Sequence, residues 1–248
     1  MIEQLGDLRG VMFTLTSLGG TAIASGNLVQ GRRDLERALQ LGRHLGLSRE
    51  VGEVLWMLGN LALSEGKWEE AAQYLNEARS YGWEGAQYAL ALRELLAGRP
   101  EAACELLLPV PDPLPILPGY PFQLLAWAEI ELGHEAEAEA LLEESIRRTT
   151  ILHEEDRWFL DPHLFQARLR ARQKRWAEAE ALLEGVLASY RPEFNGDIKA
   201  IALYFYGRLH SEKGEPDLAR QRWEAALVIL HRQGERLYAE QIERLLAQ

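Results

Sequence analysis

The sequence predicts an all-α, right-handed solenoid of about six helical hairpins followed by one terminal helix. Its 248 residues are 47% hydrophobic and 26% charged, which is enough apolar content for a large core and too much for disorder. Six stretches of the chain are alike, and their first residues are separated by 40, 32, 35, 41 and 40 residues. Self-similarity at a period of about 20–50 residues is typical of solenoids. Small and bulky residues also recur at fixed places in each stretch, as closely crossing helix pairs require.

The six stretches share a pattern that defines each hairpin. A small residue stands seven positions before the first residue of the stretch and again five positions after it, and a bulky residue follows nine positions after it. Small residues let the two helices cross closely, and we expect the bulky residues to fill the space between successive repeats. The first residues of the six stretches are Gly26, Gly66, Gly98, Gly133, Lys174 and Gly214.

Each of these first residues is predicted to form the turn of its hairpin. Glycine there would supply the left-handed backbone conformation that ends a helix. Glutamates such as Glu69 and Glu178 follow in the first turn of the second helix, where the helix dipole favours anions. Pro100 and Pro216 stand in the same turn of their helices, where a missing N–H costs little.

The proline-rich residues 107–122, LLPVPDPLPILPGYPF, hold six prolines and cannot be helical throughout. We therefore expect 109–117 to be a connector between two halves of the array. The first half, 1–108, would hold repeats 1–3, and the second, 118–234, would hold repeats 4–6. Residues 235–248 are expected to form a C-terminal capping helix.

The first residues of the chain align with the tail of a second helix, because QLGDLRGVMFTLTSLG matches HLGLSREVGEVLWMLG glycine to glycine. The chain is therefore expected to be cut from a longer array. Its first helix would then expose an apolar edge, with Val11, Leu15 and Leu18 as members. Such an edge favours self-association through the end of the array.

Composition and charge argue against several classes of function. The formal net charge is −11 and the sequence pI is near 5.1, so the surface repels phosphate backbones and direct nucleic-acid binding is not expected. No apolar run is long enough to span a membrane and no signal peptide is recognisable, so a cytoplasmic location is predicted. The single cysteine, Cys104, cannot form an internal disulfide.

The sequence predicts no enzyme, no cofactor and no metal site. GNLALSEGK, residues 59–67, fails as a phosphate loop because Trp68 stands where Ser or Thr is needed. HEED, residues 153–156, matches no zinc or calcium spacing and is better explained as a solvated linker. Cys104 lies near Glu101 and Glu105, and anionic neighbours raise the pKa of a thiol and weaken it as a nucleophile.

Residues 55–78, LWMLGNLALSEGKWEEAAQYLNEA, resemble a tetratricopeptide repeat (TPR). They carry a Leu-Gly pair on the first helix, then Ala, a large apolar residue and Ala on the second. The resemblance covers nearly the whole chain, although spacings of 40–41 residues exceed the 34 typical of the family. Longer spacings are similar to those in the C-terminal arrays of bacterial LuxR-type activators related to the maltose regulator and of multidomain signalling ATPases.

The resemblance implies a non-catalytic module that binds a protein, a peptide or another ligand in its concave groove. It further implies the sensor or interaction part of a larger bacterial signalling or transcription regulator. A free-standing cytoplasmic adaptor or scaffold is the alternative.

In TPR arrays the first helices line the groove, and the Leu-Gly register transfers the family's peptide-contacting positions to this chain. Aromatic and arginine residues predominate among them, and these types are enriched at binding hot spots. The alternative is that some of the aromatic side chains fill space between repeats. We refer to the following residues as the groove set: Trp56, Asn60, Tyr88, Gln123, Trp127, Arg168, Arg172, Tyr204 and Arg208.

Three arginines of the groove set, Arg168, Arg172 and Arg208, come from the adjacent repeats 5 and 6. Converging guanidinium groups would recognise a carboxylate or phosphate, so an acidic-ended peptide or a small anionic ligand is predicted there. The competing interpretation is that Glu131 and Glu212 neutralise the arginines and leave a structural ion-pair network. Lysine is missing from the positions that hold chaperone C-terminal peptides in related domains, so such peptides are not expected.

Overall fold

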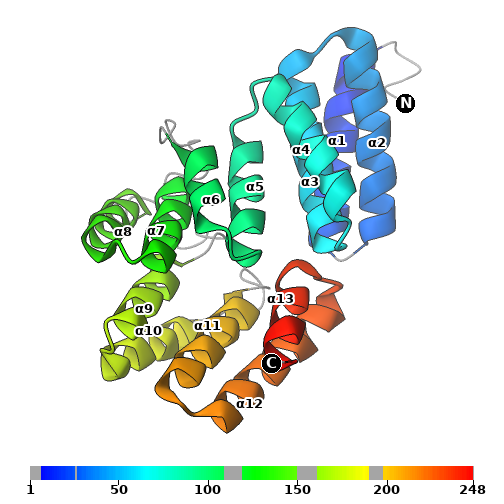
Figure 1. Cartoon of the computed structure of the whole chain (residues 1–248). Helices are drawn as coiled ribbons and strands as arrows, with labels where there is room; N and C mark the ends of the chain where they lie inside the picture. The colour runs from blue at the N-terminus through cyan, green and yellow to red at the C-terminus, as the bar shows by residue number, and fades with distance from the viewer. Residues whose placement is uncertain (1–6, 26, 109–118, 150–160, 190–197, 248) are drawn as a thin grey trace. The chain divides into compact units, whose positions relative to one another are not determined.

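The computed structural model describes residues 7–25, 27–108, 119–149, 161–189 and 198–247 (Figure 1). Within these ranges all regular secondary structure is α-helical, and the chain is a TPR-like α-solenoid of sequential helical hairpins, which confirms the predicted fold class. Six consecutive pairs, from α1–α2 to α11–α12, correspond to the six predicted hairpins, and α13 is the terminal helix. The helices are α1 (Leu8–Ala24), α2 (Leu28–Leu45), α3 (Ser48–Ser64), α4 (Trp68–Ser80), α5 (Gly85–Leu96), α6 (Pro100–Leu107), α7 (Tyr120–Leu132), α8 (Glu135–Thr149), α9 (Pro162–Arg172), α10 (Trp176–Ser189), α11 (Ile198–Lys213), α12 (Pro216–Gln233) and α13 (Leu237–Leu246).

The chain divides into two compact units, Met1–Leu90 and Ala91–Gln248. In the first unit α1 packs on α2, α2 on α3, and α3 on α4. In the second unit α7, α9 and α11 each pack on the helix that follows them, and α9 also packs on both α7 and α11. The predicted connector 109–117 lies outside the described residues, so a division of the array there stays a prediction.

The hairpin turns of repeats 2, 3, 4 and 6 adopt the predicted left-handed conformation, and the predicted turn residue of repeat 1, Gly26, lies outside the described residues. The backbone φ angles of Gly66, Gly98, Gly133 and Gly214 lie between 73° and 87°. At Gly133, as at the others, the turn N–H and the next N–H bond back to carbonyls of the first helix, Ile130 O at 3.2 Å and Glu129 O at 2.9 Å. These two hydrogen bonds satisfy carbonyl groups that the end of the helix would otherwise leave unpaired.

Repeat 5 builds the same turn without glycine. Lys174 has φ 59°, the only positive value at a non-glycine residue in the described ranges. Its N–H and that of Arg175 bond to Ala171 O and Arg170 O at 2.9 and 2.8 Å. The hairpin context therefore imposes on lysine a conformation that is strained for any residue with a Cβ.

Replacing Lys174 with glycine should raise the free energy of unfolding by about 0.5–1 kcal/mol, because it relieves that strain. The reverse change at a matched turn, Gly133→Lys, should lower it by about 1 kcal/mol, since Gly133 has φ 87° but open space around its Cα. Urea unfolding of both variants measures these values. A lower free energy of unfolding in Lys174→Gly would contradict the claim that the backbone of Lys174 is strained.

In repeats 1 and 2 the small and bulky residues of the repeat pattern face each other. A methyl group added to Gly19 would lie 2.8 Å from Leu35 Cγ, and one added to Gly59 would lie 2.6 Å from Leu75 Cγ. The bulky residue thus fills the space beside the first helix of its own hairpin. That the bulky residues also fill the space between successive repeats stays a prediction.

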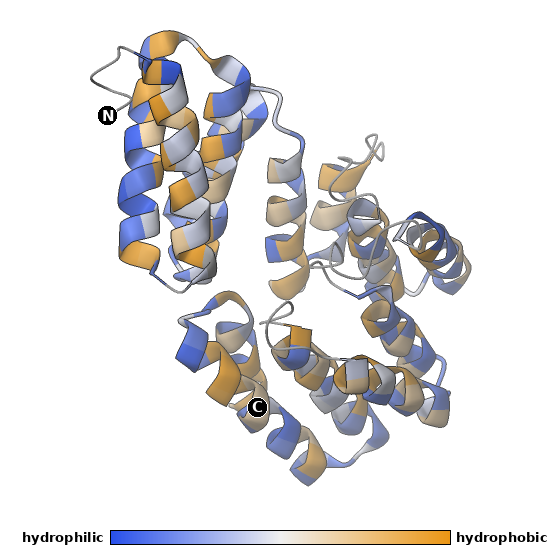
Figure 2. Ribbon diagram, turned by 180° about the vertical axis from the view of Figure 1, so that it is seen from behind, coloured by the Kyte–Doolittle hydropathy of each residue, from blue (hydrophilic) through white to orange (hydrophobic). Residues whose placement is uncertain are grey.

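Hydrophobic and hydrophilic residues alternate along most helices, as expected for helices with one buried side (Figure 2). On α1, however, the predicted apolar edge is only partly correct. Val11 and Leu15 are buried, whereas Leu18 is 52% exposed and Phe13 is 45% exposed. Leu18 follows Leu15 by three residues, which rotates it about 60° around the helix and toward solvent.

Candidate functional site

The groove set of the first unit lies on α3 and α5. Trp56 and Asn60 are half-buried, and the amide of Asn60 donates a hydrogen bond to Trp56 O at 3.0 Å within the same helix. The Trp56 ring lies beside that of Trp83, with their centroids 5.9 Å apart. Tyr88 is buried, and burial, with the nearby charge of Glu84, raises the pKa of its hydroxyl to about 12. The accessible members of the groove set in this unit are therefore Trp56 and Asn60, and Trp83 adds a second half-buried ring beside Trp56.

The groove set of the second unit is largely internal. Gln123, Trp127, Arg168 and Tyr204 are each at most 3% exposed. Buried side chains cannot contact a partner without a change of conformation. The burial of Trp127 and Tyr204 agrees with the alternative interpretation of the sequence, in which aromatic side chains fill the space between repeats.

The aromatic cluster that buries them contains three residues that the sequence register did not identify. The Trp127 ring lies 5.6 Å from that of Phe165 and 5.3 Å from that of Phe205, and Tyr204 lies 5.7 Å from Tyr238. Phe165 and Phe205 each stand nine residues before the turn residue of their hairpin, directly after a position of the Leu-Gly register. An aromatic residue recurring beside that register position was the signal that could have revealed the cluster.

Glu131 on α7 holds the two arginines that were predicted to form the anion site. Arg168 on α9 donates to it through Nε at 2.9 Å and Nη2 at 3.0 Å, a two-pronged pair. Arg208 on α11 approaches the same carboxylate at 3.1 Å, and Trp127 Nε1 donates to it at 3.1 Å. Arg168 also donates to Glu212 at 2.5 Å. We call Glu131, Arg168, Arg208 and Glu212 the ion-pair network.

The network changes the ionisation of its central carboxylate. Burial alone would raise the pKa of Glu131, but the hydrogen bond from Arg168 and the positive charges of Arg208 and Arg168 outweigh burial and lower that pKa to about 2. Glu131 is therefore ionised at neutral pH, and it neutralises cations that are largely out of contact with water.

The predicted anion site is not assembled in the structure. Arg168 and Arg208 are paired with internal carboxylates, because Glu131, one helical turn after Trp127 on α7, lies within reach of both guanidinium groups. Arg172 is exposed and forms no ion pair with the described residues. The competing interpretation, a structural ion-pair network, accounts for this arrangement.

Among the described residues, the other polar candidates show no catalytic arrangement. Cys104 Sγ lies 3.7 Å from Glu129 Oε1, and burial together with that carboxylate raises the pKa of the thiol to about 11. A thiol with so high a pKa is a poor nucleophile at neutral pH. Asp161 caps α9 by accepting a bond from the His163 N–H at 2.9 Å, and residues 153–156 lie outside the described part. The described residues contain no group of three or more potential metal ligands.

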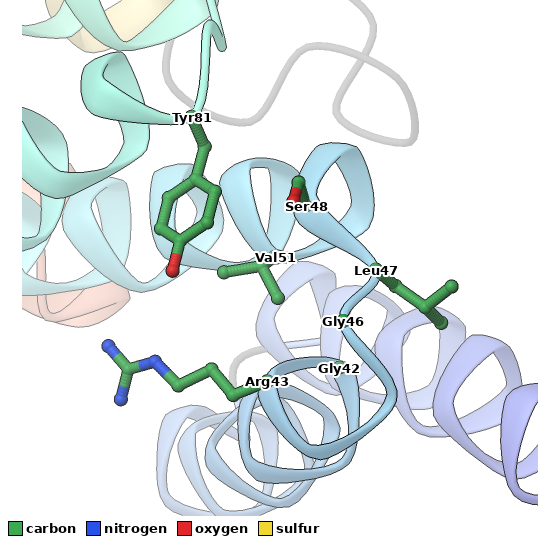
Figure 3. A pocket seen from close by; sticks show the side chains of 7 residues that line it. All are labelled: Gly42, Arg43, Gly46, Leu47, Ser48, Val51 and Tyr81. Atoms are coloured by element: carbon green, nitrogen blue, oxygen red, sulfur yellow. The ribbon is translucent and has the colours of Figure 1, made fainter.

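A small surface pocket lies in the first unit, where α2 ends and α3 begins (Figure 3). Its volume is about 120 Å³, below the range of about 300–1,000 Å³ usual for small-molecule sites. Val51 lies between the side chains of Arg43 and Tyr81, while Leu47 points away from them. Arg43 is already paired with Glu77 at 2.5 Å, so the pocket offers no free charge for a ligand. Its lining residues are Gly42, Arg43, Gly46, Leu47, Ser48, Val51 and Tyr81.

None of the helices in the described ranges has the length and hydrophobicity needed to cross a lipid bilayer.

Hairpins with left-handed turns and small residues at each crossing define a helical repeat protein, and the comparisons agree. Residues 162–230, from α9 to α12, match the family model described as tetratricopeptide repeat. A crystal structure of a tetratricopeptide repeat protein from Parabacteroides merdae shares 15% sequence identity with this chain at a TM-score of 0.50. The match covers 94% of this chain and 99% of that one. At this identity the likeness shows the fold. No match was found among curated proteins.

Proposed function

We propose that the chain is a non-catalytic interaction module that binds a protein or peptide. The observation that carries the proposal is the match of α9–α12 to the tetratricopeptide repeat family, within an array built of such hairpins throughout its described part. Helical repeat arrays present extended surfaces suited to segments of other proteins. The raised thiol pKa of Cys104 and the small volume of the pocket at α2–α3 support a binding role over a catalytic one.

The proposed contact surface in the first unit is the half-buried Trp56–Trp83 pair. Tryptophan supplies a large apolar area at small entropic cost, and it is enriched at binding hot spots. We therefore propose that an extended peptide places an apolar side chain against these two rings.

A random dodecapeptide display library panned against the immobilised protein tests this proposal. Enriched peptides should bind the parent protein, and Trp56→Ala should weaken that binding at least tenfold, as expected for a central aromatic anchor. Val228→Ala is the matched control, since Val228 is 61% exposed on α12 in the other unit and should leave binding unchanged.

Two outcomes would contradict the proposal. One is a library that yields no peptide above background. The other is a set of enriched peptides that bind the parent and the Trp56→Ala variant equally, with thermal unfolding showing both to be folded.

The biological setting that we propose is the interaction part of a larger bacterial signalling or transcription regulator. The long repeat spacing supports this setting by analogy alone. A free-standing adaptor is the second candidate. Sequencing of the parent open reading frame separates them, because an ATPase or DNA-binding domain encoded in frame would favour the regulator, and an independent gene for the repeats would favour the adaptor.

A further inference from the structure

The outward side of α1 carries no charged residue beyond Arg9 in its first turn. Residues 10–31 contain no Asp, Glu, Lys, Arg or His, in a chain whose formal net charge is −11. The exposed residues on this side of α1 are Phe13, Thr14, Ser17, Leu18 and Thr21, and we call them the α1 face.

The polar groups of the α1 face are already satisfied in part by the helix itself. The Thr14 hydroxyl donates to Gly10 O at 2.8 Å, and the Thr21 hydroxyl donates to Ser17 O at 2.9 Å. With their hydroxyls turned to the backbone, the threonines can be covered without leaving an unpaired donor. Burying this surface therefore carries little of the desolvation cost that usually attends polar side chains.

The one cation of α1 itself is engaged elsewhere. Arg9 pairs with Glu50 at 3.3 Å, and its guanidinium carbon lies 5.6 Å from the centre of the Phe13 ring. Arg9 thus borders the face and supports Phe13, which stays 45% exposed beside Leu18 at 52%. The face combines exposed apolar area with electrical neutrality.

We propose that the α1 face is a homotypic interface at which a second copy of this chain binds. Charge selects this occupant. Each copy has a formal net charge of −11, so two copies repel overall, and two α1 faces can meet without adding a close contact between like charges. A two-fold axis near Ser17 would pair Phe13 of one copy with Thr21 of the other in an isologous contact.

Sedimentation velocity of the full chain measures the association. The parent protein should shift from the 28.1 kDa monomer toward a dimer as its concentration rises to about 100 μM, the range of a modest interface. Leu18→Lys should raise the dimer dissociation constant at least tenfold. Val29→Lys is the matched control, because Val29 is 65% exposed in the same hairpin but lies on α2, and it should leave the constant unchanged.

Oxidative cross-linking provides a second measurement. Ser17→Cys should form a disulfide-linked dimer in the presence of diamide, and Val29→Cys should not, since only position 17 would lie near the two-fold axis. Both experiments use the Cys104→Ser background, so that no other thiol contributes.

Three results would overturn the proposal: a parent protein that stays monomeric at about 100 μM, a dimer that Leu18→Lys does not weaken, or equal cross-linking at positions 17 and 29. Circular dichroism before each run checks that the variants are folded, which is expected because Leu18 and Val29 are both exposed.

Discussion

Replacing Glu131 with glutamine should lower the free energy of unfolding by about 3 kcal/mol. Glutamine keeps the shape of the side chain but removes the negative charge that pairs with Arg168 and Arg208. The side chain of Arg168 is only 2% exposed, so the guanidinium cannot regain water when its partner is lost. Glu212 still pairs with Arg168, which places the loss at the lower end of the range for breaking a buried pair.

A carboxylate on the surface provides the matched control. Glu144 on α8 pairs with Arg147 and Arg148, but all three lie where solvent screens the interaction, with Arg147 71% exposed. Glu144→Gln should therefore change stability little. Chemical denaturation of both variants at pH 7 measures the difference. Equal losses would mean that the ion-pair network contributes no more than a surface pair.

The Glu131→Gln variant also tests how the free energy of unfolding depends on pH. The pKa of Glu131 is lowered from about 4.5 to about 2 by folding, so its ionised form stabilises the native state. That contribution is complete above about pH 5 and is lost as the pH falls through 4.5 toward 2. The stability difference between the parent and Glu131→Gln should therefore shrink over this window. A difference that stays constant down to the acid limit would show that the charge of Glu131 is not its source.

The sequence predicted the hairpins because each is specified locally. The turn residue, the small residue before it and the bulky residue after it lie within about one repeat, and their spacing alone indicates two crossing helices. Lys174 shows the strength of this pattern. The residue is unsuited to the left-handed conformation, yet the neighbouring helices impose it.

The state of the groove set could not be predicted in the same way. The register places Trp127 and Tyr204 on the inner sides of their helices, but it does not say how closely α7, α9 and α11 approach one another. Once they pack, Phe165 and Phe205 close the space around these rings. The exposure of a side chain depends on how several repeats pack together, so it cannot be predicted from the sequence of one repeat.

The partners within the ion-pair network could not be predicted from the sequence for the same reason. Glu131 and Arg168 are separated by 37 residues, and the register places them at neighbouring positions on adjacent helices. Whether the arginine points to the carboxylate or to a ligand depends on distances that only the packed helices fix. The sequence therefore supported two interpretations, and the structure selected the internal pair.

Replacing Gly207 with alanine should lower the free energy of unfolding by about 1–3 kcal/mol, although alanine is the better helix former. Gly207 on α11 faces the bulky residue of its hairpin, which in repeat 6 is Trp223. An added methyl group would lie 2.2 Å from Trp223 Nε1 and 2.3 Å from Cδ1, so the indole must move. That movement would break the bond that Nε1 donates to Tyr204 O at 3.2 Å.

A second glycine separates this clash from the general effect of the substitution. Gly185 on α10 has no atom within 4 Å of the place where a methyl group would stand. Gly185→Ala should therefore raise the free energy of unfolding by about 0.5–1 kcal/mol through helix propensity alone. Urea unfolding followed by circular dichroism compares the two variants, and a gain of stability in both would refute the close crossing at Gly207.

The other repeats suggest how the clash can be relieved. Repeats 3, 4 and 5 have alanine where repeat 6 has Gly207, and each combines that alanine with a buried leucine in place of Trp223. Trp223→Leu alone should destabilise the hairpin, since it leaves the glycine gap partly empty. In the double variant the new methyl group fills that gap and restores the alanine–leucine pair. The combined loss should then be smaller than the sum of the two single losses by about 0.5–3 kcal/mol, and strict additivity would show that the two positions do not share one space.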